Sequence, residues 1–285
     1  VSPCFMLSGC ILHIVIKDVL QKSAASREPR GRLNPIDFHE HVDFQTFAPP
    51  ADLAPFIEHF WVVHTKQNSE TYSSEQLMHR PYIDIFISAQ QSGIQGTFCN
   101  KRLYTAAADT RIIGVRFHPG AFHAFNSGSM VDLRGTVVEL AQVFPSFDAQ
   151  CIQKLLVWDD QVIFSKLIEQ LRMLQPKQDT NIELVRTVID MVEANDTLQT
   201  VASVAGAIGK SERWLQHLFQ EYVGVGLKWF LQTKRLLAAA QRIRGGAEGW
   251  AALAYDAGYS SQQHFITDFK RVICKTPRQY KMELG

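Results

Sequence analysis

Two amides, a hydroxyl and several cations follow one face of the second of two short helices that residues 254–280, near the C-terminus, predict on either side of a turn at Gly258 and Tyr259. Gln263, Thr267 and Lys270 recur at spacings of four and three, which places them on one side of a helix. His264 and Arg271 flank them. Amide and hydroxyl groups hydrogen-bond to base edges in a DNA groove, and cations suit phosphates. The pattern predicts a helix that contacts nucleic acid, and an ordinary solvated helix face is the alternative.

A second segment, residues 211–222, divides its side chains in the same way. Leu215, Leu218 and Phe219 take the core side. Ser211 precedes them as a predicted N-cap, whose hydroxyl accepts a hydrogen bond from a free backbone N–H. The outward positions are polar and hold Arg213, Gln216, His217 and Gln220. Because Arg pairs with guanine and Gln with adenine in the major groove, this segment is predicted as a second base-reading helix.

Both segments belong to an internal repeat with an offset of about 50 residues. Residues 201–230 and 250–280 each read as a short helix, a glycine turn, a second helix and a closing apolar residue. Gly209 matches Gly258 at the turn. This is the order of a helix-turn-helix motif, present twice. Residues 226–243 between the copies are rich in Ala and Leu and are predicted to form one connecting helix. Two such units would suit half-sites about 34 Å apart, one helical turn of DNA.

Charge is uneven along the chain of 285 residues, although the formal net charge is only +1. Residues 210–281 hold 12 Lys and Arg against 5 Asp and Glu. The rest of the chain holds 17 basic and 23 acidic residues. A basic end on a mildly acidic body suggests a polyanionic partner at that end. Cations that would meet a phosphate backbone from the connecting helix or the helix ends are Lys228, Lys234, Arg235, Lys275 and Arg278.

The first half of the chain favours strands. Residues 42–47, 56–64, 82–88 and 111–118 are short stretches rich in β-branched and aromatic side chains. Residues 136–144 and 147–174 read as helical, and the polar residues 175–181 read as a linker. The length suggests about two domains, and a composition of 46% hydrophobic and 20% charged residues is that of a globular protein.

Two charged residues stand among the apolar strand residues. Asp84 and Arg116 are predicted to bind a polar ligand if both face one pocket. A structural ion pair is the alternative. The histidines show no convincing ligand spacing, so neither a metal nor another cofactor is expected.

The five cysteines are scattered and form no CxxC pair, so neither a zinc site nor a disulfide framework is indicated. Reduced cysteines fit a cytoplasmic protein. A rival function is an enzyme that accepts an alkyl group on Cys99 or Cys151, which would need an activated thiol. Neither residue lies in a Pro-Cys-His or multi-cysteine setting, so no catalytic residue is expected.

Residues 1–35 begin with an apolar stretch that contains LSGC, a sequence similar to a lipoprotein cleavage box. No Lys or Arg precedes it, and the apolar run is too short to span a bilayer. We expect this region to be an N-terminal extension that need not be ordered, and we expect no membrane partner.

Residues 182–282 resemble the DNA-binding domain of the AraC/XylS family of bacterial transcription regulators. GKSERWLQHLFQEYVG resembles its first recognition helix, and AGYSSQQHFITDFKRV followed by TPRQY is similar to its C-terminal signature. The resemblance implies seven helices, two helix-turn-helix units and a rigid linker helix. By position it implies base-reading roles for Arg213, Gln216, His217, Gln262, Gln263 and Thr267. Helical periodicity, however, places Gln262 nearer the core side than Gln263.

One residue departs from the family pattern. Cys274 stands where the family usually has Gly before the TP dipeptide. In the repeat it matches Gly224, at a helix end where a left-handed turn favours glycine. The match predicts a positive φ at Cys274, and the alternative is an ordinary turn in which Cys274 packs as a small apolar residue.

The front part is similar, through LAPFIEHFWVVH, YIDIFIS and GVRFHPGAFHAF, to a β-rich domain of unknown function often found ahead of this DNA-binding domain. In such regulators the front domain senses a small molecule, mediates pairing, or both. The predicted class is therefore α+β: a β-rich regulatory domain with helices over residues 36–174, a linker over 175–181 and an all-α domain over 182–285. Expected partners are promoter or operator DNA, a small-molecule effector, a second copy of the chain, and RNA polymerase if the protein is an activator.

Overall fold

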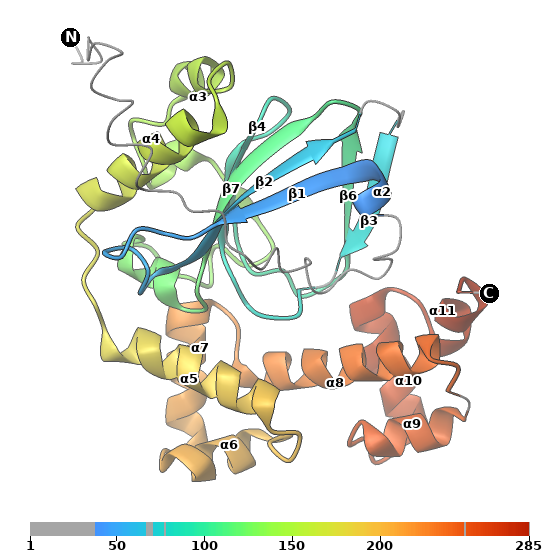
Figure 1. The fold of residues 1–285 in the computed structure, drawn as a ribbon. Helices are drawn as coiled ribbons and strands as arrows, with labels where there is room; N and C mark the ends of the chain where they lie inside the picture. The colour runs from blue at the N-terminus through green and yellow to red at the C-terminus, as the bar shows by residue number, and fades with distance from the viewer. Residues whose placement is uncertain (1–37, 67–70, 77, 248, 285) are drawn as a thin grey trace.

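The computed structural model describes residues 38–66, 71–76, 78–247 and 249–284. It has the predicted α+β class, with a β-rich front part above a helical C-terminal part (Figure 1). The extension predicted over residues 1–35 lies outside the described residues. Within the described ranges, no helix combines the length and the apolar character that crossing a membrane requires.

An antiparallel six-stranded sheet forms the centre of the front part. Its strand order is β1-β2-β7-β4-β5-β8. Four of these strands cover the four ranges that the sequence predicts as strands. The six are β1 (Val42–Phe47), β2 (Ile57–Thr65), β4 (Asp84–Ser88), β5 (Gly93–Gln95), β7 (Arg111–Phe117) and β8 (Val137–Val138).

The two faces of this sheet have different neighbours. On one face, Phe60 and Val115 are fully buried, and the Phe60 ring packs 5.3 Å from the ring of Phe164 on α4 (Asp160–Met173). The other face is covered by a separate two-stranded ribbon of β3 (Thr71–Gln76) and β6 (Arg102–Ala107), which stands apart from the main sheet in Figure 1. The sequence did not predict this ribbon, because its strands are polar and lack the apolar runs of the others.

Residues 136–144 do not form the helix predicted for them. Residues 137–138 form β8, which pairs with β5, and a short 3-10 helix, η2 (Leu140–Gln142), follows. Two adjacent valines favour a strand over a helix once a sheet edge is available. The remaining helices of the front part are α2 (Phe38–His41), η1 (Ala121–Ala124) and α3 (Ala149–Leu155).

The described residues from 180 to 284 form seven helices, as the resemblance implies. Helix α8 runs the length of this part and joins two similar pairs of helices (Figure 1). The seven are α5 (Thr180–Ala194), α6 (Val201–Ile208), α7 (Glu212–Val223), α8 (Leu227–Arg244), α9 (Trp250–Asp256), α10 (Gln262–Ile273) and α11 (Pro277–Met282).

The front part and the first helix-turn-helix unit share one hydrophobic core, which extends from Phe47 on β1 to Leu231 on α8. The second unit has a core of its own, which extends from Leu236 to Tyr280. The front part also approaches the end of α7 closely, because a Cβ added to Gly224 would lie 2.3 Å from the carbonyl oxygen of Met130. Packing, and not only the segment between α4 and α5, therefore fixes α7 against the front part.

Candidate nucleic-acid interface

The two predicted recognition helices begin in the same way. Ser211 caps α7 and Ser261 caps α10. Each hydroxyl accepts a hydrogen bond from the backbone N–H three residues later, over 3.2 Å from Trp214 and 3.3 Å from His264. Such a cap satisfies a donor that has no partner within the helix, which stabilises the first turn. The first turn of each helix is thus held in a defined position at the surface.

Helix α7 exposes three of its four predicted base-reading residues, namely Arg213, His217 and Gln220. Gln216 is half-buried. Its Oε1 lies only 2.6 Å from where a Cβ on Gly226 would stand, so its side chain lies along the start of α8. The Nε2 atom of Gln220 also lies 3.3 Å from that point, although Gln220 is exposed, so Gln216 differs from the other three in its burial.

Helix α10 exposes all of its predicted contact residues, which are Gln262, Gln263, His264, Thr267, Lys270 and Arg271. The expectation that Gln262 lies nearer the core was wrong. Gln262 is the first residue of α10, directly after the capping Ser261, and its side chain is exposed.

Two of these side chains have partners within the protein. The hydroxyl of Thr267 donates to the carbonyl of Gln263 over 2.9 Å, which leaves its methyl group free to contact a base. Arg271 donates to Gln232 over 2.8 Å and to Asp268 over 3.0 Å. Arg271 is thus held beside α8, where a cation suits the phosphate backbone more than a base edge.

The flanking cations differ in their partners. Lys275 is paired with Glu283, and only 22% of its side chain is exposed. Lys234 is paired with Asp196 over 3.0 Å, and the guanidinium of Arg235 lies over a tyrosine ring. Of the flanking cations, Lys228, Lys270 and Arg278 are exposed and have no acidic partner among the described residues. These three are therefore available to a phosphate.

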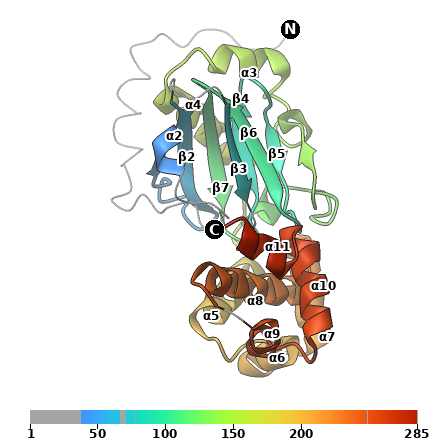
Figure 2. The same ribbon diagram turned by 90° about the vertical axis from the view of Figure 1, so that its right-hand side faces the viewer.

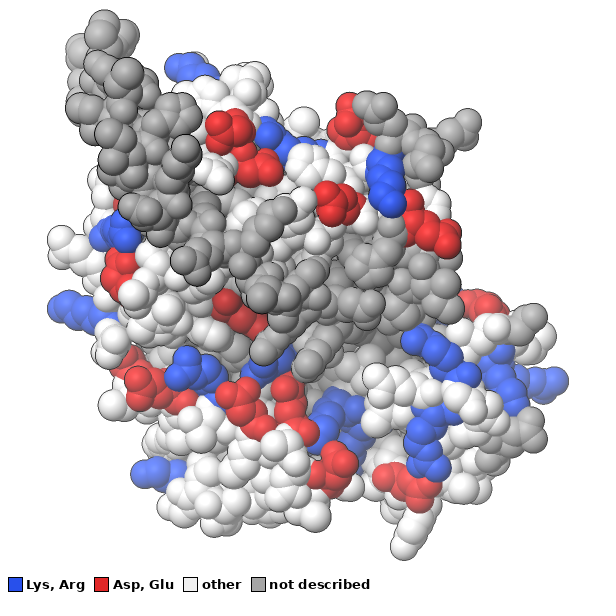
Figure 3. Space-filling view, in the orientation of Figure 1, with Lys and Arg blue, Asp and Glu red and all other residues white. Residues whose placement is uncertain are grey.

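Helices α7 and α10 lie on the same side of α8, and α5 lies on the other side (Figure 2). Figure 3 shows the face that carries α5, where acidic and basic side chains are mixed, while Lys and Arg gather over the region of α8 and α11. The two capped helices are therefore presented together on the side away from α5.

A cavity of about 420 Å³ lies between the six-stranded sheet and the ribbon of β3 and β6. Asp84 and Arg116 are directly paired across β4 and β7, and both line this cavity. Arg116 donates to Asp84 twice, over 2.9 Å and 2.7 Å. Burial raises the pKa of the Asp84 carboxyl, and Arg116 opposes that shift. The two residues thus form a structural ion pair that also faces the cavity.

The rest of the cavity wall is mainly apolar and aromatic, with Phe44, Trp61 and Phe86 from the main sheet. The ribbon adds Tyr104 and a further cation, Arg102. Sequence reasoning missed both, because β6 gave no strand signal. The sole hint was alternation within RLYTAA, in which residues 102, 104 and 106 are the less exposed ones.

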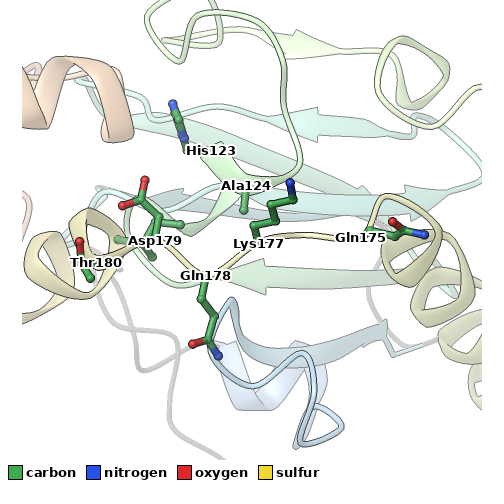
Figure 4. Close-up of a pocket in the computed structure, with 8 residues that line it drawn as sticks. His123, Ala124, Gln175, Lys177, Gln178, Asp179 and Thr180 are labelled. Atoms are coloured by element: carbon green, nitrogen blue, oxygen red, sulfur yellow. The ribbon is translucent and has the colours of Figure 1, made fainter.

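A second hollow, of about 590 Å³, lies beside the segment between α4 and α5. Its polar side chains do not converge, since His123, Lys177 and Gln178 point in different directions (Figure 4). Within the described part of the chain, no three His, Cys, Asp or Glu side chains are grouped so that they would hold a metal ion. The helical pair α7 and α10 and the sheet cavity are therefore the two candidate sites.

Comparison with known proteins gives two family matches. Residues 204–283 match a helix-turn-helix domain, and residues 45–139 match a domain of unknown function. The regulatory protein SoxS of Salmonella typhimurium is 30% identical over 103 residues, which are 36% of this chain and 96% of SoxS. SoxS of Escherichia coli is 35% identical over 81 residues, 28% of this chain and 76% of that protein.

Another relative is matched over a smaller share of its length, and a solved structure over nearly all of it at low identity. The F1 operon positive regulatory protein of Yersinia pestis is 36% identical over 74 residues, 26% of this chain and 25% of that protein. ToxT from Vibrio cholerae, a solved structure, aligns with 79% of this chain and 98% of its own at 13% identity, with a TM-score of only 0.34. With a helix-turn-helix match over both units and nearly the whole of SoxS covered, the chain belongs to the AraC family of helix-turn-helix transcription regulators, which act by binding DNA.

Proposed function

We propose that this regulator reads specific base pairs with the exposed faces of α7 and α10, which enter successive major grooves of one duplex. The observation that supports this is the equivalent capping and exposure of the two helices on one side of α8. The proposed base-reading residues are Arg213, His217 and Gln220 on α7 and Gln262, Gln263, His264 and Thr267 on α10. The proposed phosphate contacts are Lys270, Arg271 and Lys275 together with Lys228 and Arg278.

The test is the salt dependence of binding by the full chain to duplexes selected from a random-sequence pool. Log affinity should fall linearly with log salt, with a slope of about −0.9 for each phosphate neutralised. A slope of several units and a strong preference for the selected sequences are expected. Affinity that does not respond to salt, or that is equal for selected and unselected duplexes, would contradict the proposal.

The front part is proposed to sense a small-molecule effector in the cavity between the sheet and the ribbon. A volume of about 420 Å³ suits a small ligand. Asp84 and Arg116 are proposed ligand contacts, because their ion pair forms part of the wall. The same ligand would change the affinity of the C-terminal part for DNA only if it binds one arrangement of the two parts better than another.

A second proposed role of the front part is pairing with another copy of the chain. Val157 and Trp158, between α3 and α4, are 81% and 41% exposed. Adjacent large apolar side chains at the surface are typical of an interface. Light scattering of the wild type and of Val157→Asp tests this, because pairing through this loop predicts a dimer that the aspartate converts to a monomer. An identical mass for the two proteins would exclude this loop as the interface.

Catalysis is not part of the proposed function. Burial raises the pKa of the Cys99 thiol, with Arg134 and Arg271 opposing the shift, so this thiol is not an activated nucleophile. The proposed location is the cytoplasm, where a regulator reaches promoter DNA, and RNA polymerase is a proposed partner if the protein activates transcription.

A further inference from the structure

One loop of the front part contacts both recognition helices. Residues 96–101 connect β5 to β6, and we refer to them as the bridging loop. The hydroxyl of Thr97 donates to the carbonyl of Val223 on α7 over 3.3 Å. The backbone N–H of Lys101 donates to the carbonyl of Val272 on α10 over 3.1 Å. The ends of β5 and β6 face the C-terminal helices in Figure 2. The bridging loop thus joins the last turns of α7 and α10.

The bridging loop also contacts the helix between them. Phe98 forms a buried cluster with Met78 and Tyr82 of the front part, and Trp229 of α8 packs against this cluster. The indole N–H of Trp229 is buried and finds no acceptor among the described residues. Packing on this cluster and on the main hydrophobic core, and not a hydrogen bond, therefore holds this ring. The loop and its cluster therefore contact α7, α8 and α10 together.

The same cluster is in direct contact with the cavity. The guanidinium of Arg116 lies 3.6 Å from the centre of the Tyr82 ring, and that of Arg102 lies 5.1 Å from the centre of the Phe98 ring. Both arginines line the cavity. Stacking of a cation on an aromatic ring is attractive and depends on the position of the cation. A ligand that draws either arginine into the cavity would therefore weaken its contact with the cluster.

The charges of the cavity wall favour an anion. Asp84 is matched by Arg116. Arg102 donates to the carbonyl of Gly135 over 2.6 Å, but no carboxylate pairs with it among the described residues. One positive charge in the wall is therefore left without a counter-charge, among side chains that are mainly apolar and aromatic. A planar guanidinium binds a carboxylate through two parallel hydrogen bonds.

We infer that the cavity binds a small apolar carboxylate on Arg102, and that the bridging loop transmits its binding to α7, α8 and α10 by changing the distance between the recognition helices. This inference rests on the proposed function, in which α7 and α10 read one duplex. When a carboxylate binds the guanidinium of Arg102, that guanidinium gives up its hydrogen bond to Gly135 and its contact with the Phe98 ring. The start of β6, which is the end of the bridging loop, is then no longer held by these contacts. The spacing of half-sites that the protein accepts then depends on the ligand.

The cavity arm of the test uses the full chain labelled with 5-fluorotryptophan, whose five fluorine signals are assigned by single Trp→Phe variants. The probes are 2-naphthoate and its neutral carboxamide. Trp61 reports on the cavity, Trp229 reports on the cluster, and the exposed Trp158 is the internal control. We expect 2-naphthoate to shift the first two signals and not the third. We expect the carboxamide to bind about tenfold more weakly, because it lacks the charge.

Two variants test the role of Arg102. Arg102→Gln should abolish the preference for the carboxylate over the carboxamide, and Arg102→Lys, which retains the charge, should keep most of it. Equal binding of the two probes by the wild type, or no shift of Trp61, overturns the ligand class. A shift of Trp61 with Trp229 unchanged overturns the transmission through the cluster.

The DNA arm uses duplexes selected with the wild type, with one base pair inserted between the two half-sites. We expect the insertion to weaken wild-type binding by about tenfold, because the two helices are held at one spacing. The double variant Thr97→Val, Phe98→Leu should lose less than about threefold, since its helices are less strictly held. Asn100→Ala changes an exposed residue of the same loop and should behave as the wild type.

The outcomes of the two arms are distinguishable. Equal losses in the wild type and the double variant would show that the bridging loop does not set the spacing, and the inference would fall. If the wild type binds no duplex in a salt-dependent manner, the proposed DNA reading itself fails, and the inference about transmission fails with it. The fluorine signals still decide in that case whether Arg102 selects a carboxylate.

Discussion

Arg213 and Gln263 occupy the same place in the two helix-turn-helix units. Each is the second residue of its helix, each follows a capping serine by two positions, and both side chains are exposed. The same offset of 50 residues pairs His217 with Thr267, which are also exposed. A recognition helix contacts base edges mainly through its N-terminal residues. These paired positions therefore define one reading face that occurs twice.

Gln263 and Lys270 should behave differently when each is replaced by alanine. Gln263→Ala should cost about 1–3 kcal/mol at the selected site and relax the preference at one base pair, because an amide reads a base edge. Lys270→Ala should weaken binding to all sequences alike and lower the salt slope by about one unit. Binding to a set of single-base variants at several salt concentrations separates the two effects.

Lys275→Ala serves as the comparison for Lys270→Ala. Lys275 is already paired with Glu283, so its removal should reduce the salt slope less than the removal of Lys270. The assignment of α10 is wrong if Lys270→Ala changes the preference at a single base pair while Gln263→Ala weakens every sequence equally.

Gln216 should contribute little to sequence preference, although the family resemblance implies a base-reading role. Its equivalent in the second unit is Ile266, and both residues are half-buried. Gln216 lies against the start of α8 rather than in front of α7. Gln216→Ala should therefore change the affinity for the selected duplex by about 0.5 kcal/mol or less. Gln220→Ala, one turn further along α7, is the matched variant: its amide also reaches the start of α8, but its side chain is exposed, so it should cost more. A larger loss for Gln216→Ala would restore the family assignment.

Stability should decrease on mild acidification because of His118. Burial lowers the pKa of this histidine from its ordinary value of 6.5, with Glu58 opposing the shift and Arg186 adding to it. The unfolded chain then binds the proton more readily than the folded chain, so stability is present above about pH 6.5 and is lost as the pH falls toward the folded-state pKa. Urea unfolding at about pH 7.5 and about pH 5.5 measures this loss.

The variant His118→Gln isolates this effect from the titration of other groups. It keeps a polar side chain but cannot be protonated in this range. The wild type should lose more stability than His118→Gln over the same pH interval. Parallel losses in the two proteins would mean that another group causes the acid sensitivity.

The sequence predicted the helices of the C-terminal part well, because their information is local. A serine cap, an apolar stripe and a glycine turn lie within about 20 residues of each other, and they suffice to define α7 and α10. The bridging loop was not predictable in this way. Its bond from Thr97 to Val223 joins residues 126 positions apart, and no local pattern encodes it. The cavity was not predictable either, because one of its walls is the polar ribbon of β3 and β6. These two segments form strands because they pair with each other, and β propensity depends strongly on such context.

The helix ends illustrate the same limit. The repeat correctly predicted that Cys274 has a positive φ, like Gly224: the two residues have φ of 63° and 80°. It did not predict that their surroundings differ. Cys274 is exposed, whereas Gly224 lies against the carbonyl of Met130. Space and conformation therefore both favour glycine in the first unit, whereas conformation alone favours it in the second, where Cys274 adopts the left-handed φ.

This difference predicts opposite responses to substitution. Cys274→Gly removes a left-handed strain of about 1 kcal/mol, and the greater freedom of glycine in the unfolded chain offsets about 0.4–1 kcal/mol of that gain. The melting temperature should stay equal or rise slightly, and DNA sequence preference should not change. Gly224→Ala adds a Cβ at the same left-handed conformation and 2.3 Å from the Met130 oxygen, so it should destabilise by about 2 kcal/mol or more. Thermal unfolding of the full chain under reducing conditions compares the two. A clear fall in melting temperature for Cys274→Gly would mean that the thiol packs favourably at this turn and that this packing outweighs the backbone strain.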